Sequence, residues 1–99
     1  MSLESKFQAK VLLFLKELRL EGVKIWFFKT IKSNENGVPD IVGCIDGKMF
    51  TIELKREKGN ELSPEQEIQK DRILYANGMY LALKECVDYK ERIRRFLDV

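Results

Sequence analysis

The sequence predicts a single α/β domain over residues 1–99, with elements in the order αβββαβα and a mixed sheet flanked by helices. Three observations support this fold class. Apolar residues recur at helical spacing near the N-terminus, an Asp-Gly dipeptide separates two β-rich runs, and a Ser-Pro-Glu-Gln run opens a later helix. A chain of 99 residues is also too short for two domains, since chains usually divide only beyond roughly 250 residues.

Residues 3–18 place apolar side chains three and four positions apart, which predicts an N-terminal helix. Ser2 can cap its start and Gly22 its end. The β-branched and aromatic run 23–28 predicts a strand, followed by a polar loop at 30–37 that can face a substrate. Strands of this composition normally lie inside a sheet, so we expect the aromatics at positions 26 to 28 to be core residues and not base-stacking groups.

The dipeptide at positions 46 and 47 joins the runs 38–45 and 48–55, and Asp-Gly is typical of a two-residue type I′ hairpin. Such a turn fixes the register of the two strands. Counting back from it places Asp40 directly opposite Glu53.

The second half of the chain predicts a helix, a strand and a final helix. Ser63 is a candidate N-cap, a proline follows it, and Gln66 can close a capping box. This helix should run to about Asn77, and a short strand, 79–83, should follow it before a last helix that begins near Asp88. Two strands joined through a helix run parallel, so the sheet should be mixed.

Composition excludes several classes of function. The chain has no histidine, which excludes Ser-His-Asp and Cys-His catalysis and His-ligated zinc. Cys44 and Cys86 cannot complete a four-ligand zinc site, and we expect both to be buried thiols. No apolar stretch approaches the roughly 20 residues needed to span a bilayer, and no signal-peptide segment is visible, so we expect a cytoplasmic protein without membrane association. A net charge of +2 is too small to indicate a polyanionic partner by itself.

The facing acids suggest chemistry. Like charges directly opposite each other destabilise an antiparallel pair, so Asp40 and Glu53 require an explanation, and a divalent cation held by oxygen ligands provides one. Lys55 lies two residues beyond Glu53 and therefore on the same face. A metal ion, two carboxylates and a lysine are sufficient for phosphodiester hydrolysis without histidine.

These residues also form a recognisable ordered pattern. Gly-Val-Pro-Asp at 37–40 followed by Glu-Leu-Lys at 53–55 resembles the PD-(D/E)xK nuclease motif. With Glu4 on the first helix and Ser-Pro-Glu-Gln at 63–66, the set resembles the VRR-NUC (virus-type replication-repair nuclease) domain over nearly the whole chain. The resemblance implies a restriction-endonuclease-like fold with an αβββαβ core and a C-terminal helix.

The resemblance also implies roles for individual residues. Asp40 and Glu53 would bind Mg²⁺, for which Mn²⁺ may substitute, and Leu54 would add its backbone carbonyl. Lys55 would orient or deprotonate the attacking water. Two further positions, Glu4 as a metal ligand and Gln66 as a site residue, have a competing structural explanation.

That competing explanation is helix capping. An acid in the first turn of a helix interacts favourably with the helix dipole, which accounts for Glu4 without a metal. A glutamine at the third helical position closes a capping box, which accounts for Gln66 without catalysis. Gln8, one turn beyond Glu4, is a weaker candidate for an indirect role at the site.

The resemblance favours a structure-selective DNA endonuclease, specifically a homodimeric Holliday junction resolvase that cuts four-way junctions. A flap or nicking nuclease, a non-catalytic nucleic-acid-binding module and a partner-binding structural protein are the alternatives. The apolar residues of the last helix, Ile93, Phe96 and Leu97, could serve either the core or a dimer interface. Candidate DNA contacts are the cations beside the motifs and on the first helix, namely Lys29, Lys32, Arg56, Lys58, Lys6 and Lys10.

Overall fold

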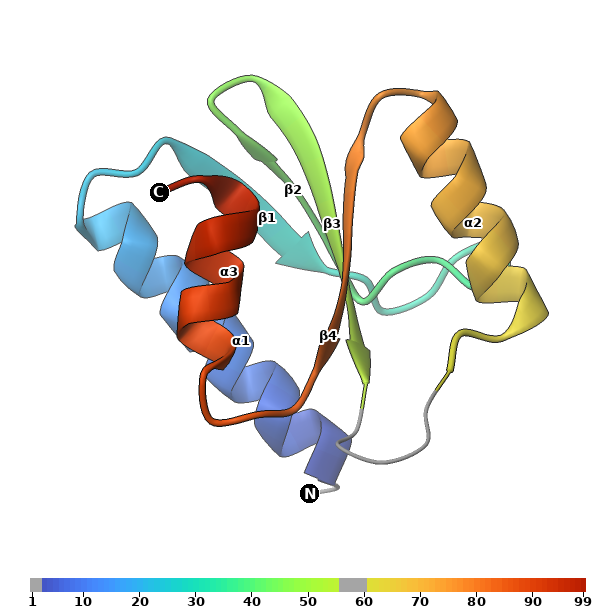
Figure 1. The fold of residues 1–99 in the computed structure, drawn as a ribbon, viewed down its shortest axis with the longest axis horizontal. Coiled ribbons are helices and arrows are strands. Elements are labelled where there is room, and N and C mark those ends of the chain that lie inside the picture. The colour runs from blue at the N-terminus through green and yellow to red at the C-terminus, as the bar shows by residue number, and fades with distance from the viewer. Residues whose placement is uncertain (1–2, 56–60) are drawn as a thin grey trace.

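A computed structural model describes residues 3–55 and 61–99 of the chain (Figure 1). The element order αβββαβα agrees with the prediction. Along the chain the elements are α1 (Leu3–Leu20), β1 (Ile25–Lys29), β2 (Ile41–Ile45), β3 (Lys48–Lys55), α2 (Pro64–Tyr75), β4 (Met79–Lys84) and α3 (Tyr89–Leu97).

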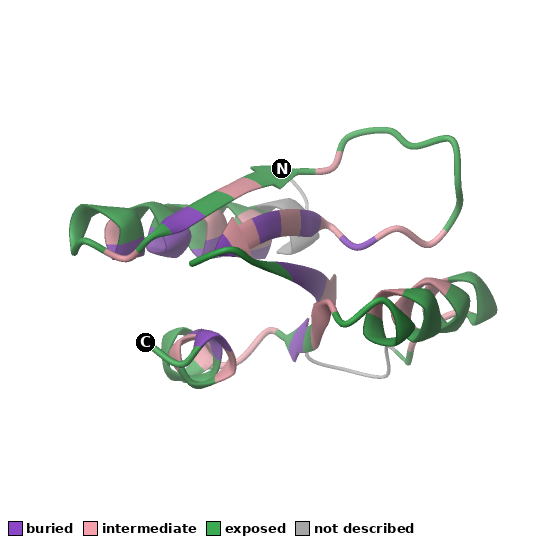
Figure 2. Ribbon diagram, turned by 90° about the horizontal axis from the view of Figure 1, so that it is seen from above, coloured by how far each residue is buried: buried purple, intermediate pink, exposed green. Residues whose placement is uncertain are grey.

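The four strands form one mixed sheet in the spatial order β1-β2-β3-β4. The first three strands are antiparallel, and β4 runs parallel to β3 after the crossover through α2. Helices α1 and α3 lie on one face of the sheet and α2 lies on the other, as Figures 1 and 2 show from two directions. The predicted α/β class and mixed sheet are therefore confirmed.

The β2–β3 hairpin has the predicted register. Its paired residues run from the turn to Ile41 opposite Ile52, and both turn residues have positive φ, 47° at Asp46 and 85° at Gly47, as a type I′ turn requires. Strand β2 begins at Ile41, however, and not at residue 38, so Asp40 and Glu53 do not form a ladder pair.

Contacts made by the residues just before Ile41 account for the early end of the ladder. Pro39 has no N–H to donate, and its carbonyl accepts a hydrogen bond from the Thr30 hydroxyl at 2.7 Å. The Asp40 carbonyl accepts from the Thr30 backbone N–H at 2.8 Å. The chain before Ile41 is thus tied to the end of β1.

The prediction that the β1 aromatics are core residues is wrong for two of the three. Strand β1 is an edge strand covered on one face only, and Trp26 and Phe28 point to the other face with 59% and 46% of their surface exposed. Phe27 packs against the core, and the Arg19 guanidinium lies 5.7 Å from its ring centroid.

The hydrophobic core fills the space between the sheet and the α1/α3 layer (Figure 2). Phe50 is fully buried there, and Gly43 on β2 makes room for its ring, because a Cβ at Gly43 would lie 2.6 Å from the Phe50 ring carbons. Other fully buried members are Leu15, Leu18, Ile41, Ile52 and Leu83.

Helix ends largely follow the predicted caps. Gly22 has φ of 100° after α1, and Ser63 and Gln66 form the predicted capping box of α2. Helix α2 ends at Tyr75, and Asn77, with φ of 66°, supplies the left-handed residue in place of the expected helix continuation. Ser2, the expected cap of α1, lies outside the described residues.

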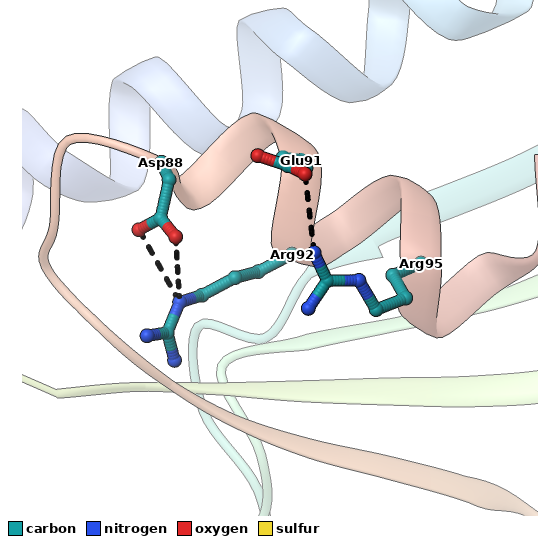
Figure 3. A network of polar contacts seen from close by, with 4 residues as sticks. All are labelled: Asp88, Glu91, Arg92 and Arg95. Carbon is teal, nitrogen blue, oxygen red and sulfur yellow. Dashed lines mark hydrogen bonds and ion pairs between the residues drawn. The ribbon is translucent and has the colours of Figure 1, made fainter.

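Helix α3 completes the core with Ile93 and Leu97, which are buried, while Phe96 packs against them partly buried. Its outer surface carries two exposed ion pairs one turn apart, Asp88 with Arg92 at 3.3 Å and Glu91 with Arg95 at 3.1 Å (Figure 3). Exposed pairs of this kind contribute about 0–1 kcal/mol each, so α3 is held mainly by its apolar residues.

Cys44 and Cys86 are only partly buried, which corrects the expectation of buried thiols. The pKa of Cys86 is raised, first by its burial and then by a hydrogen bond with Asp88.

Within residues 3–55 and 61–99, no helix combines the length and the apolar character needed to cross a membrane.

Candidate active site

Two acidic residues meet at one end of the β2–β3 pair. The Asp40 carboxylate accepts a hydrogen bond from the Leu54 backbone N–H at 2.7 Å, and Glu53 is 4% exposed on the neighbouring strand. The predicted convergence of Asp40 and Glu53 therefore occurs through a side-chain contact with β3 and not through a sixth ladder pair.

Leu54 contributes its backbone to this site. In an antiparallel sheet the N–H and C=O of one residue point to the same neighbouring strand. Because the Leu54 N–H reaches Asp40, the Leu54 carbonyl lies along the same edge of β3. The Leu54 side chain packs against the core, so only its backbone belongs to the site.

Tyr80 on β4 is a site residue that the sequence reasoning missed. It pairs with Thr51, and strand alternation places it on the same face as Glu53. Its hydroxyl is buried and has no hydrogen-bond partner among the described residues. Burial raises the pKa of Tyr80, and the negative charges of Glu53, Glu67 and Asp40 raise it further.

Besides burial, Glu53 and Asp40 both raise the pKa of Tyr80, so both carboxylates lie near its hydroxyl. Asp40 and Glu53 with the Leu54 carbonyl form an all-oxygen donor set. Mg²⁺ commonly binds one or two carboxylates and keeps waters or phosphate oxygens in its other positions. These residues therefore fit the predicted ion.

The third predicted metal ligand, Glu4, lies in the first turn of α1. The side chain of Glu4 lies outside the described residues, and Gln8 is half-buried on α1. Among the described residues, no group of three or more acidic, cysteine or histidine side chains is gathered for a metal ion. The described part of the site is a two-carboxylate arrangement.

Lys55, at the end of β3, is held in place by Gln66 in the first turn of α2. The Lys55 ammonium donates to the Gln66 side-chain oxygen at 2.7 Å, and the same oxygen accepts from the Ser63 backbone N–H at 2.9 Å. The two explanations for Gln66 are therefore compatible, because one oxygen closes the capping box and contacts Lys55 at the same time.

The glycine of the Gly-Val-Pro-Asp motif brings α2 to the site. Gly37 has φ of 79°, and a Cβ there would collide with the Glu65 backbone carbonyl and lie 2.7 Å from the Gln66 nitrogen. Only glycine satisfies both conditions. The first turn of α2 thus rests on the loop that carries Asp40.

Two polar contacts continue this packing along α2. The Gln69 side chain donates to the Asn36 carbonyl at 3.2 Å, and Arg72 forms an ion pair with Glu35 at 3.1 Å. The loop 30–37 and α2 are therefore joined over more than one turn of the helix.

The candidate DNA contacts are spread over several elements. Lys32 and Asp40 both line a hollow of about 370 Å³ formed by the loop, and Lys29 is exposed at the end of β1. Lys6 and Lys10 are exposed on α1, in the layer across the sheet from α2. Arg56 and Lys58 lie outside the described residues.

Lys84 is an additional cation that the sequence reasoning did not select. It is exposed on β4 and pairs with Lys55 in the parallel register. Strand β4 therefore adds both Lys84 and Tyr80 to the end of the sheet where the acids meet.

Comparisons with known proteins agree with this architecture at the level of fold. No protein-family model matches the sequence, and no curated protein matches it. A solved structure described as a VRR_NUC domain is similar, with a TM-score of 0.68 and 17% sequence identity over 93% of this chain and 94% of that one. The likeness confirms the predicted fold, which this chain shares with that VRR_NUC domain.

Proposed function

We propose that this chain is a Mg²⁺- or Mn²⁺-dependent, structure-selective DNA endonuclease that hydrolyses phosphodiester bonds, and that it works as a homodimeric Holliday junction resolvase. One observation carries the proposal. At the same end of a sheet with the VRR-NUC fold, Asp40 approaches β3, Glu53 is buried, and Lys55 is held 2.7 Å from the Gln66 oxygen.

The chain's residues divide the work of hydrolysis between them. Asp40, Glu53 and the Leu54 carbonyl would hold the ion, which when bound polarises a phosphoryl oxygen and lowers the pKa of a water molecule. The Lys55 ammonium has three donors and gives one of them to Gln66. Its other donors can orient the attacking water or neutralise charge that develops on the phosphate.

The protein would select DNA by its shape and not by its base sequence. The helices and strands are taken up by the sheet and its two layers, which leaves no separate module for reading bases among the described residues. Recognition would therefore depend on where the geometry of the DNA places its phosphates. Lys32, which lines the same hollow as Asp40, and Lys84, which pairs with Lys55, would contact such phosphates. A two-fold dimer would present two sites to a symmetric four-way junction.

The dimer surface must lie away from the inner side of α3. Ile93 and Leu97, which could have served an interface, are buried in the core. Sedimentation equilibrium of the protein alone tests the dimer separately from catalysis, and a monomer at all concentrations would contradict that part of the proposal.

The test of activity is cleavage of a labelled four-way junction, a 5′ flap and a plain duplex, each with Mg²⁺, Mn²⁺ or EDTA. We expect paired symmetric nicks in the junction, and their loss with EDTA. Asp40→Asn should reduce cleavage to the EDTA background, and Lys55→Ala should reduce it about 10²- to 10³-fold, the usual range for loss of a donor that stabilises developing charge.

The hairpin tip offers matched controls. Asp46→Asn and Lys48→Ala make the same chemical changes at exposed positions at the opposite end of β2 and β3, and should leave cleavage unchanged. Cleavage of flaps or duplex in place of junctions would support the nuclease activity and contradict the resolvase activity. DNA binding without cleavage under any metal condition would favour a non-catalytic binding module.

A further inference from the structure

Two aromatic rings lie exposed on the sheet face that carries the candidate active site. Trp26 and Phe28 are two residues apart on β1, and their ring centroids lie 5.4 Å apart with the planes tilted by 55°. Met49, also exposed, lies in the same row as Trp26 across β2. We call Trp26, Phe28 and Met49 the aromatic patch.

The aromatic patch shares its face with the site residues. Phe28 pairs with Val42, which pairs with Thr51, and Glu53 follows Thr51 by two residues on the same face. With strands about 4.8 Å apart and about 3.3 Å per residue, Phe28 and Glu53 are separated by about 12 Å. A DNA strand whose phosphate is at Glu53 can therefore bring a nearby base to Phe28.

Hydrogen bonds connect the end of β1 to the candidate site. Thr30 follows Phe28 by two residues, and it donates hydrogen bonds to the carbonyls of both Pro39 and Asp40. Thr30 and Asp40 also line the same hollow in the loop, together with Lys32. The hollow that Asp40 lines therefore begins two residues beyond Phe28, at Thr30.

Charge around the patch suits a polyanion. Within six residues of β1 on either side, the charged residues are Arg19, Glu21, Lys24, Lys29, Lys32 and Glu35, and both acids are paired, Glu21 with Arg94 and Glu35 with Arg72. Lys24 precedes the two rings in the chain and Lys32 follows them, whereas Lys29 alternates to the other face of β1. Positive charge therefore flanks the aromatic patch along the chain, as in surfaces that bind single strands by stacking and phosphate contacts.

The area of the patch does not suit a second protein chain. A large aromatic side chain buries about 150–250 Å² when fully covered, so three half-exposed side chains offer roughly 300 Å². A stable protein interface needs about 800 Å² per partner. The patch is large enough for one or two bases and too small to form a dimer interface alone.

We propose that Trp26 and Phe28 stack on an unpaired base of the DNA strand that enters the active site, so that the substrate carries a single-stranded or unstacked nucleotide beside the scissile phosphate. This inference rests on the proposed nuclease function, which it extends by naming the part of the substrate that is not base-paired.

Trp26 is the sole tryptophan, so its fluorescence reports on this surface directly. The protein is titrated in EDTA, where no cleavage occurs, with a single-stranded oligothymidine and with a blunt duplex of equal length. We expect the single strand to quench Trp26 emission strongly and the duplex to quench it weakly. Phe28→Leu should weaken single-strand binding roughly 5- to 150-fold, the value of one stacked base.

Leu13→Ala is the matched control, because Leu13 is as exposed as Trp26 but lies on α1; it should leave binding unchanged. Equal quenching by single strand and duplex, or unaltered binding by Phe28→Leu, would overturn the inference. Emission that changes with protein concentration alone would also overturn it, since the patch would then be a self-association surface.

The fluorescence and cleavage experiments test the two proposals independently. Cleavage that depends on Asp40 without quenching of Trp26 would support the nuclease function and contradict base stacking. Quenching without cleavage would support the stacking surface and contradict the nuclease function.

Discussion

The two faces of the sheet bury different kinds of side chain. Toward α1 and α3 the buried residues of the strands are apolar, with Phe50, Ile52 and Leu83 almost fully enclosed. Toward α2 the buried residues include Thr51 and Glu53, which are polar, and none of the residues of α2, all of which the structure describes, is buried.

The α1/α3 side of the sheet supplies most of the folding stability, and the α2 side carries the candidate active site. Apolar burial stabilises the sheet from the α1/α3 side, by about 25 cal/mol for each Å² removed from water. Helix α2 is positioned by its capping box, by contact with Gly37 and by exposed polar contacts of small individual value. Its position brings Gln66 to Lys55, which indicates that α2 serves the site more than the core.

The largest expected effect is the loss of a core ring. Phe50→Ala should lower the free energy of unfolding by about 3–5 kcal/mol, because it leaves a cavity over Gly43. Ile68→Ala on α2 removes a half-exposed side chain and should change the free energy of unfolding by no more than about 0.5 kcal/mol. Urea denaturation measures both, and similar losses would contradict the contrast between the two faces.

The second prediction compares two glycines with positive φ, Gly37 at 79° and Gly47 at 85°. Alanine at either position costs about 1–2 kcal/mol for the left-handed backbone. Only Gly37→Ala also collides with α2, which should add about 1–3 kcal/mol and displace the helix from the site. Denaturation and cleavage assays on both variants provide the comparison. Equal stability and equal cleavage would show that the contact with α2 is unimportant.

The hairpin half of the site could be predicted because its determinants are local. The Asp-Gly turn fixes the β2–β3 register, and the Ser-Pro-Glu-Gln run fixes the start of α2. The end of the ladder at Ile41 depends on a hydrogen bond from Thr30 to Pro39, and no local pattern indicates that bond.

The contributions of β4 and β1 depend on tertiary structure. A parallel crossover does not set register as a tight turn does, so the pairing of Tyr80 with Thr51 and of Lys84 with Lys55 could not be predicted. The β-rich composition of β1 suits either a central or an edge strand, and only the sheet order shows that Trp26 is exposed.

The third prediction separates the two roles of the Gln66 oxygen. Ser63→Ala and Gln66→Ala each remove half of the capping box and should each cost about 1 kcal/mol of folding stability. Only Gln66→Ala releases the Lys55 ammonium, and loss of a defined position can reduce a reaction rate by up to about 10²-fold. Cleavage should therefore fall in Gln66→Ala and persist in Ser63→Ala. Equal activity of the two variants would reduce Gln66 to a helix cap.

The smallest expected effect concerns Tyr80 at alkaline pH. Burial and three nearby carboxylates raise its pKa in the folded protein, whereas the unfolded chain ionises near the ordinary value of 10.0. Above that value the unfolded state binds fewer protons than the folded state, so Tyr80 makes stability fall as pH rises; below it the Tyr80 contribution is fully present.

Tyr80→Phe should remove this fall and leave the contribution of the lysines, which both proteins share. Urea denaturation of the two proteins from pH 8 to pH 11 would show curves that run parallel up to about pH 10 and then diverge. Curves that stay parallel throughout would mean that burial and the three carboxylates do not raise the pKa of Tyr80, and the polar character assigned to the α2 face would lose its main electrostatic support.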